Sequence, residues 1–347
     1  MNMRTPICDL LGIEYPIFAA GMGSVTMAPL TAAVSAAGGC GVLGATFFTP
    51  DELRDEIRAV RKITDRPFGV DLLIPGDIPE DLNAREVPPF PDFLSDLLPK
   101  VKGLEGKPPP PLTIELARAQ LAVTLEEKVP LMVSALGTPP WLIDECHRAG
   151  TKVMSMVGSV RHARKLEEAG VDAIVAQGME AGGHVGTVTT MVLVPGVVDA
   201  VSVPVLAAGG IGDGRAIAAG LMLGAQGAWI GTRFIATKEA TTHENHKLGI
   251  LKADEHGTIV SRCYTGKPSR VLQNEFTTRW KDRDRELLPM PWQRIRVESL
   301  VAPARAAGLM DIANYPTGQG AGAIDDIPGA ADLFRRLVDE TEGALSR

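Results

Sequence analysis

The stretch VPVLAAGGIGDGRAIAAGLMLGAQGAWIGTRF, residues 203–234, contains two short apolar runs separated by one segment of helical period. The first run, 205–208, ends on the glycine-rich GGIGDG, and the second, 228–231, leads into GTRF. A buried strand, a glycine turn, a helix and another buried strand make one β-α-β unit with parallel strands. Because the runs are apolar at consecutive positions, we expect the sheet to be covered on both faces.

The same alternation of strand and helix patterns occurs eight times along the chain. Strands are predicted at 16–20, 41–45, 68–73, 131–135, 152–157, 173–177, 205–208 and 228–231. Helices are predicted at 27–37, 51–63, 113–127, 140–149, 160–169, 192–201, 214–223 and 242–254. Eight such units predict an α/β fold of the closed (β/α)8 type, a TIM barrel, with an open doubly wound sheet as the alternative.

Two segments do not fit a bare barrel. Residues 75–111 are rich in proline and too long for an ordinary connection, so we expect an insertion after strand 3, either a lid over the mouth or a partner-facing flap. Residues 258–347 follow the eighth unit and contain helical patterns near 299–309 and 329–345. The predicted division is a barrel over 1–257, with the insertion, and a C-terminal extension over 258–347 that packs on or near the barrel mouth.

The composition indicates a compact protein that acts on small molecules. Of 347 residues, 45% are hydrophobic and 22% are charged, and the formal net charge of −7 argues against general binding to nucleic acid or anionic membranes. No apolar run has the length of a membrane span or a signal peptide, so we expect a cytoplasmic protein without membrane association. Four widely spaced cysteines predict neither disulfides nor a zinc site: Cys8, Cys40, Cys146 and Cys263.

Two glycine-containing loops predict a phosphate site. Reactive and binding groups of a barrel collect after the carboxyl ends of its strands. Gly209 and Gly210 follow strand 7, while Gly231 and Thr232 end strand 8. Glycine lets backbone N–H groups approach a phosphate closely, and the N-terminus of the following helix favours negative charge. A dinucleotide fingerprint fits less well, because GGIGDG follows the seventh strand rather than the first.

Two further loops predict the reacting part of the site. AAGMGS follows strand 1, and its Ala20, Gly21 and Met22 could form a floor or wall for a flat ring. His184 lies in GMEAGGHVG after strand 6, and an imidazole with a pKa near 6.5 suits a general base or acid. The pair His243 and His246 lacks further ligands, so no metal is predicted.

Six motifs in combination resemble the nitronate monooxygenase family, whose members are FMN-dependent TIM barrels. They are PIFAAGMG (16–23), AAVSAAGGCGVLGA (32–45), RPFGV (66–70), AQGMEAGGHVG (176–186), AAGGIGDGRAI (207–217) and GTRF (231–234). The likeness covers most of residues 5–260 and returns in PTGQGAGAIDDIPGA at 316–330.

The resemblance implies a role for each position that matches a motif. The FMN phosphate would be held by Gly209, Gly210, Gly231 and Thr232. The isoalloxazine would lie along Ala20, Gly21 and Met22, and the ribityl chain or ring edge would lie near Gln177, Gly182 and Gly183. His184 resembles the family's active-site histidine, placed over the flavin beside the substrate.

Two positions depart from the pattern of some relatives. Asp71 follows FGV where those relatives have asparagine, and Met156 stands in the strand 5 loop where they have lysine. A carboxylate beside the flavin would repel the electron-rich reduced form, and loss of lysine removes a stabilising cation.

The resemblance implies an FMN oxidoreductase, and three functions stay open. The leading one is oxidation of alkyl nitronates with O2 to a carbonyl compound and nitrite. The alternative is an NAD(P)H-dependent reductase of an enoyl thioester or a quinone, favoured by residues 262–296, where nine Lys or Arg stand against four acids. The third is a non-catalytic barrel that binds a phosphorylated ligand or another subunit. The expected partner is a small-molecule substrate, and a homodimer is a further option.

Overall fold

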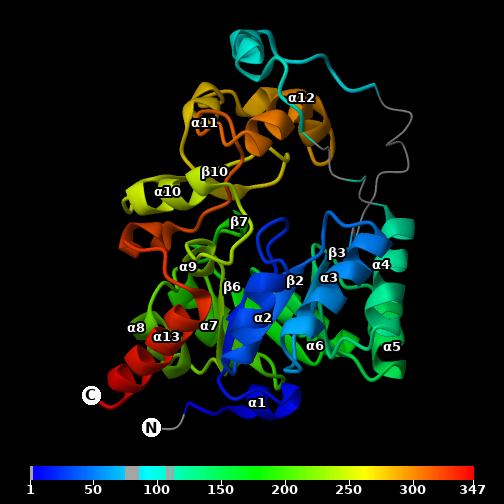
Figure 1. The fold of residues 1–347 in the computed structure, drawn as a ribbon, viewed down its shortest axis with the longest axis vertical. Coiled ribbons are helices and arrows are strands. Elements are labelled where there is room, and N and C mark those ends of the chain that lie inside the picture. Colours follow the sequence, from blue (N-terminus) through cyan, green and yellow to red (C-terminus); the bar gives the residue numbers. More distant parts are fainter. Residues whose placement is uncertain (1–2, 75–85, 107–109, 111–112) are drawn as a thin grey trace.

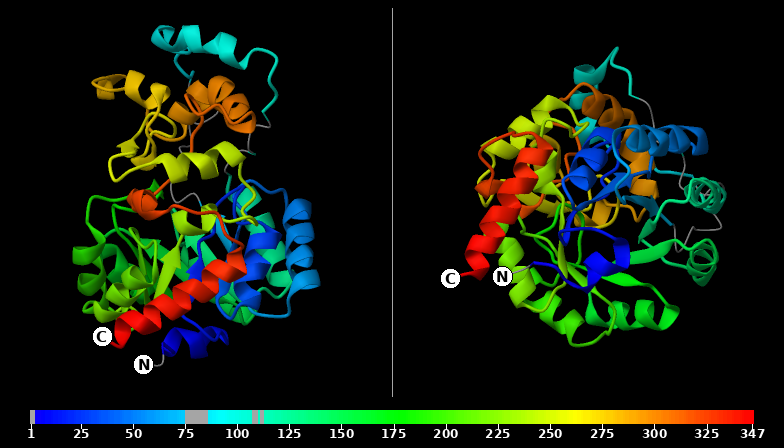
Figure 2. Two further views of the ribbon diagram at one scale, coloured as in Figure 1. Left: turned by 60° about the vertical axis from the view of Figure 1, so that its left-hand side comes forward. Right: turned by 60° about the horizontal axis from the view of Figure 1, so that its bottom comes forward.

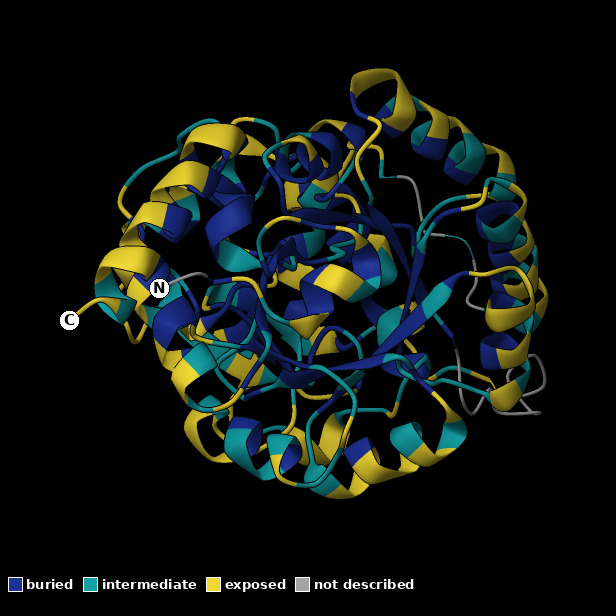
Figure 3. Ribbon diagram, turned by 90° about the horizontal axis from the view of Figure 1, so that it is seen from below, coloured by how far each residue is buried: buried dark blue, intermediate teal, exposed yellow. Residues whose placement is uncertain are grey.

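The computed structural model describes residues 3–74, 86–106, 110 and 113–347. Eight parallel strands close into a barrel in the order β1-β2-β3-β4-β5-β6-β8-β9, and β9 pairs with β1. This pairing confirms the predicted (β/α)8 fold and excludes the open sheet. Helices surround the strands on the outside (Figure 3). The barrel strands are β1 (Ile17–Ala19), β2 (Cys40–Gly44), β3 (Gly69–Leu73), β4 (Leu131–Ala135), β5 (Lys152–Val157), β6 (Ala173–Gln177), β8 (Val205–Ala208) and β9 (Gly227–Ile230).

Side chains fill the amino-terminal end of the barrel. The rings of Phe18 and Trp229 stack with centroids 6.2 Å apart, and Val133 and Met154 belong to the same buried cluster. Helix α1 (Pro6–Leu11) closes this end, because Ile7, Cys8 and Leu11 join the cluster from below (Figure 1). A ligand can therefore reach the strands only from their carboxyl ends.

Seven helices follow the strands in the expected order and cover the barrel. Thr49 begins α3 with a reciprocal capping box to Glu52, and Gly170 ends α6 in the left-handed conformation with a φ of 95°. Within the part of the chain that the structure describes, no helix is long and apolar enough to cross a membrane. The seven are α2 (Ala28–Ala36), α3 (Pro50–Ile63), α4 (Ile114–Glu126), α5 (Pro140–Arg148), α6 (Val160–Ala169), α7 (Thr190–Val198) and α8 (Gly214–Met222).

The eighth position of the helix layer differs from the prediction. It is taken by α13 (Ala330–Leu345), which packs between α8 and α2 and buries Leu333, Phe334 and Leu337 against the barrel (Figure 1). The segment predicted for this place forms α10 (Glu244–Lys252), which packs on the 3-10 helix η3 (Gln319–Ala323) instead. Helix α10 lacks a continuous apolar face, so it cannot cover the barrel as α13 does. The end of the predicted extension thus belongs to the barrel layer.

The remaining C-terminal residues form a cap over the carboxyl ends of the strands (Figure 2). Strands β10 (Thr258–Ser261) and β11 (Ser269–Leu272) make an antiparallel sheet with the two-residue strand β7 (Gly183–His184). A separate hydrophobic core joins this sheet to the helices, with Tyr264, Phe276, Trp280, Val297 and Leu300 among its members. The cap helices are α11 (Glu275–Arg279), the 3-10 helix η2 (Asp284–Glu286) and α12 (Trp292–Ala306), and the short α9 (Thr232–Ile235) links the barrel to them.

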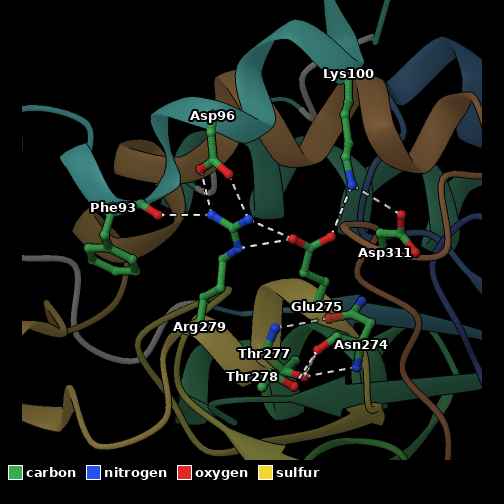
Figure 4. Close-up of polar contacts among 9 residues, drawn as sticks. All are labelled: Phe93, Asp96, Lys100, Asn274, Glu275, Thr277, Thr278, Arg279 and Asp311. Atoms are coloured by element: carbon green, nitrogen blue, oxygen red, sulfur yellow. Dashed lines mark hydrogen bonds and ion pairs between the residues drawn. The ribbon is translucent and has the colours of Figure 1, made fainter.

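Part of the predicted insertion packs on the cap. Its 3-10 helix η1 (Asp92–Val101) contributes Leu94 and Leu97 to the cap core. Arg279 of α11 bridges the carboxylates of Asp96 and Glu275, while Lys100 contacts Glu275 at 2.9 Å (Figure 4). Residues 75–85, 107–109 and 111–112 lie outside the described residues, so the choice between a lid and a flap stays a prediction.

Candidate active site

A cavity of about 1010 Å³ lies where the carboxyl ends of the strands meet the cap. Every residue that the sequence proposed for the site contributes to its wall. They are Ala20, Gly21, Met22, Asp71, Gln177, Gly182, Gly183, His184, Gly209, Gly210, Gly231 and Thr232. The structure therefore brings together residues from five barrel units, while the role of each stays a prediction.

The glycines after β8 provide exposed backbone donors. Gly209 and Gly210 have φ angles of 100° and 73°, which side chains other than glycine rarely adopt. The N–H groups of Gly210 and Thr232 donate to no described residue. The Thr232 hydroxyl oxygen accepts a 2.8 Å hydrogen bond from the Gly318 N–H, so its own proton is still available. These donors could hold a phosphate.

The N-terminus of α8 does not contribute as the sequence suggested. Its first N–H, that of Gly214, donates to Glu340 of α13 at 2.9 Å, and the N–H of Ala216 donates to the capping Asp213 at 3.0 Å. Two carboxylates thus already occupy this helix end. The free donors are the N–H groups of Gly210 and Thr232, which corrects the expectation that the N-terminus of α8 faces the phosphate.

The wall after β1 consists of backbone and very small side chains. A Cβ on Gly21 would lie 2.3 Å from the Cβ of Asp71, and one on Gly44 would lie 2.2 Å from the carbonyl carbon of Met22. Both approaches exclude any side chain larger than hydrogen. The close contact between β1, β2 and β3 leaves a smooth surface against which a flat ring could pack.

Asp71 is a buried acid without a polar partner. The residue is 4% exposed, and no described residue forms a hydrogen bond with its side chain. Burial raises the pKa of the Asp71 carboxyl well above its usual range, and no charged neighbour contributes to the shift. The neutral acid is therefore favoured, so the charge repulsion anticipated from the sequence is relieved. A protonated carboxyl can donate a hydrogen bond, as asparagine does.

His184 is held from both sides. As part of β7 it pairs with Ser269 of the cap, and its carbonyl oxygen accepts a 2.6 Å hydrogen bond from Nε2 of Gln177. The side-chain amide of Gln177, which was expected to lie near the ribityl chain or the ring edge, thus binds β7. Gly182 packs against the returning chain, because a Cβ there would lie 2.8 Å from the nitrogen of Gly318. The loop is anchored despite its glycines.

A threonine of the cap contacts the imidazole ring of His184. Nε2 of the imidazole lies 3.0 Å from the hydroxyl of Thr265, and this hydroxyl donates to the carbonyl oxygen of Lys267 at 3.2 Å. A hydroxyl whose one proton goes to that carbonyl can accept from Nε2, and this arrangement favours the tautomer in which Nδ1 keeps a free lone pair. The pKa of His184 is lowered to about 4, mainly by burial and to a smaller extent by the positive charges of Lys267 and Arg294. The ring is therefore neutral at pH 7.

Several wall residues carried no recognisable sequence signal. Thr265 lies 81 positions from the histidine it contacts. Phe47 comes from the loop after β2, and Arg305 comes from α12. Tyr315 has a buried hydroxyl without a partner among the described residues. Met156, noted as a departure, also contributes to the wall.

The two histidines considered as a metal pair, His243 and His246, form hydrogen bonds within the protein. Nδ1 and Nε2 of His246 bond to the hydroxyls of Thr242 and Thr317. Nδ1 of His243 accepts from the N–H of Asn245 at the start of α10. Across residues 3–74, 86–106, 110 and 113–347, no three His, Cys, Asp or Glu side chains are grouped as a metal site would require.

Comparisons with known proteins identify relatives along the whole chain. The family model described as nitronate monooxygenase matches residues 4–340. A Mycobacterium tuberculosis protein with the provisional name of a monooxygenase is 40% identical, over 97% of this chain and 96% of its own. From the same organism, 5-hydroxy-7a-methyl-1-oxo-octahydro-1H-indene-4-carboxyl-CoA dehydrogenase is 32% identical, over 97% and 96%. The structure of nitroalkane oxidase from Streptomyces ansochromogenes superposes with a TM-score of 0.86 at 32% identity, covering 98% of this chain and 99% of that one.

Proposed function

The chain belongs to the nitronate monooxygenase family and is an oxidoreductase, and from this premise we propose that it oxidises alkyl nitronates with O2. The products would be a carbonyl compound and nitrite. The observation that carries the proposal is the neutral His184, held beside a cavity whose wall combines small residues with free backbone donors. These are the features that a flavin and a small anionic substrate require together.

The wall fits FMN. Gly209, Gly210, Gly231 and Thr232 would hold its phosphate, and Ala20, Gly21 and Met22 would lie along the ring system. The buried Asp71 carboxyl, which has no protein partner among the described residues, would donate a hydrogen bond to a polar atom of the ring. When bound, FMN supplies the electron acceptor of the reaction.

The charges around His184 favour a substrate that is already an anion. A base whose pKa is held at about 4 is weak at removing a proton from carbon, so a neutral nitroalkane is poorly activated. Lys267 and Arg294, whose charges depress that pKa, attract a nitronate instead. Once the anion is bound, it offsets their field, and His184 can orient it or hold a proton at Nδ1.

One anaerobic experiment tests this function. We expect purified protein loaded with FMN to lose its yellow colour when ethyl nitronate is added without oxygen, and to regain it with air, with release of nitrite. A colourless protein that cannot be reconstituted with FMN would exclude every flavoenzyme proposal. A His184→Ala protein that keeps FMN and full turnover would remove the role assigned to the histidine.

A second function is favoured by the cations of the cap. NAD(P)H could reduce the flavin, which would pass a hydride to an enoyl thioester or a quinone. Lys267 and Arg294, from the basic segment 262–296, contribute to the cavity wall, and a 32% identical relative is named as a CoA-ester dehydrogenase. Rapid anaerobic bleaching by NADH or NADPH, with none by nitronate, would favour this function over the first.

A further inference from the structure

Three cations of the cap gather on one part of the cavity wall. Arg294 and Arg305 lie on α12, eleven residues apart. Eleven residues make about three helical turns, so both side chains project from the same face of the helix. Lys267 reaches the wall from the turn between β10 and β11. This face of α12 also presents Glu298, which contacts Arg294.

Both guanidinium groups lie near one aromatic ring of the barrel. The Phe47 centroid is 5.5 Å from the guanidinium carbon of Arg294 and 5.8 Å from that of Arg305. Both distances are in the range of cation–π attraction, which holds the side chains in place without neutralising them. The ring follows β2, so the cluster spans the boundary between barrel and cap.

The positive charge of this cluster is only partly compensated. Glu298 lies 3.5 Å from Nε of Arg294, while Arg305 and Lys267 form no ion pair with any described residue. Burial lowers the pKa of Arg294, as does the positive charge of Arg305, whereas Glu298 opposes the shift. Two like charges held close together in a partly enclosed space, on a protein whose net charge is −7, favour a bound anion.

The cluster differs from the predicted phosphate loops and adjoins the proposed reacting centre. The loops follow β8 and β9, whereas the cluster belongs to the loop after β2, to α12 and to the β10–β11 turn. Lys267 and Arg294 lie near enough to His184 for their charges to lower its pKa. The cavity, at about 1010 Å³, is at the upper end of the range for a single small ligand, so a cofactor leaves room for a substrate of some length.

We propose that Arg294 and Arg305, which lie beside Phe47, act together with Lys267 to bind a carboxylate or phosphate group that the substrate carries in addition to its reacting group. This subsite selects for substrates with two polar ends, one at His184 and one under α12. The inference rests on the proposed function of the same cavity, but it concerns binding, which can be measured without turnover.

The test is calorimetric titration of the FMN-loaded protein with two anions. Butanoate stands for a substrate with a carboxylate, and adenosine 3′,5′-bisphosphate stands for the phosphate end of a CoA ester. We expect at least one to bind, and Arg305→Gln and Arg294→Gln to weaken its binding by about tenfold or more, as for loss of one charge-assisted hydrogen bond. Which anion binds identifies the source of the charge.

Matched variants keep the result interpretable. Arg285→Gln removes a charge from the same cap at an exposed position outside the cavity wall, and should leave the affinity within about twofold of wild type. Arg305→Lys preserves the charge and should retain most of the affinity, which separates loss of charge from misfolding. If neither anion binds, or if Arg285→Gln weakens binding as much as Arg305→Gln, the subsite is refuted. A protein that binds the anion but never oxidises a nitronate would refute only the proposed reaction.

Discussion

Replacement of Asp71 by asparagine tests the proposal that this side chain is a neutral acid in the folded protein. In the unfolded chain the carboxyl ionises near its usual pKa of about 4. Burial raises its pKa in the folded protein, so above pH 4 the folded state holds a proton that the unfolded state has released. Stability must therefore fall as pH rises through the window between the two pKa values.

The magnitude follows from one proton. Within that window the free energy of unfolding of the flavin-free wild type should fall by about 1.4 kcal/mol per pH unit relative to Asp71→Asn. Measured directly, unfolding in guanidinium at low buffer concentration should release one proton more from the wild type than from the variant. An indicator dye counts these protons without any assumption about unfolding intermediates.

The exposed Asp55, changed to asparagine, provides the control and should release as many protons as the wild type. Equal proton release from wild type and Asp71→Asn at pH 6 would mean that Asp71 is ionised in the fold. The hydrogen-bond donor proposed for the flavin ring would then be absent.

Three further predictions concern the histidine and the ring wall. If the neutral form of His184 is the active one, its pKa of about 4 places the acid limb of kcat/KM near pH 4, and a limb near 6.5 would contradict the burial argument. Thr265→Val removes the acceptor for Nε2 and should lower kcat/KM about tenfold, whereas Thr265→Ser keeps the hydroxyl and should retain the wild-type value. An unchanged kcat/KM in the valine variant would contradict the tautomer assigned to His184. Gly44→Ala places a Cβ against the backbone of Met22, so it should lower the free energy of unfolding in chemical denaturation by about 1–3 kcal/mol and weaken FMN binding. Gly343→Ala is the control on α13: it has open space around it, so neither the free energy of unfolding nor FMN binding should fall.

The parts of the fold that depend on local pattern were predictable. Each barrel strand is a short apolar run between turn residues, and the structure places all eight within a few residues of the expected ranges. The glycine loops and His184 follow strands, so the topology of a barrel brings them to one rim without further information. Helix α13 was misplaced because helical period does not tell which layer a helix joins.

The chemistry of the site depends on contacts that no local pattern encodes. The protonation of Asp71 follows from burial among three strands, and its sequence neighbours give no sign of it. The tautomer of His184 depends on Thr265, which the antiparallel pairing of β7 with β11 brings beside it. The cluster around Phe47 combines a barrel loop with a helix some 250 positions later in the chain. The last two of these arrangements require the cap to be folded on the barrel.

The return of α13 to the helix layer gives the cap an unexpected place in the chain. Between β9 and α13 the polypeptide leaves the barrel, builds the cap and comes back, so the cap is the enlarged βα loop of the eighth unit. Shortening the chain from its carboxyl end would therefore open the barrel before it exposed the cavity. A bare barrel would instead need an internal excision, with β9 rejoined to α13 by a short linker.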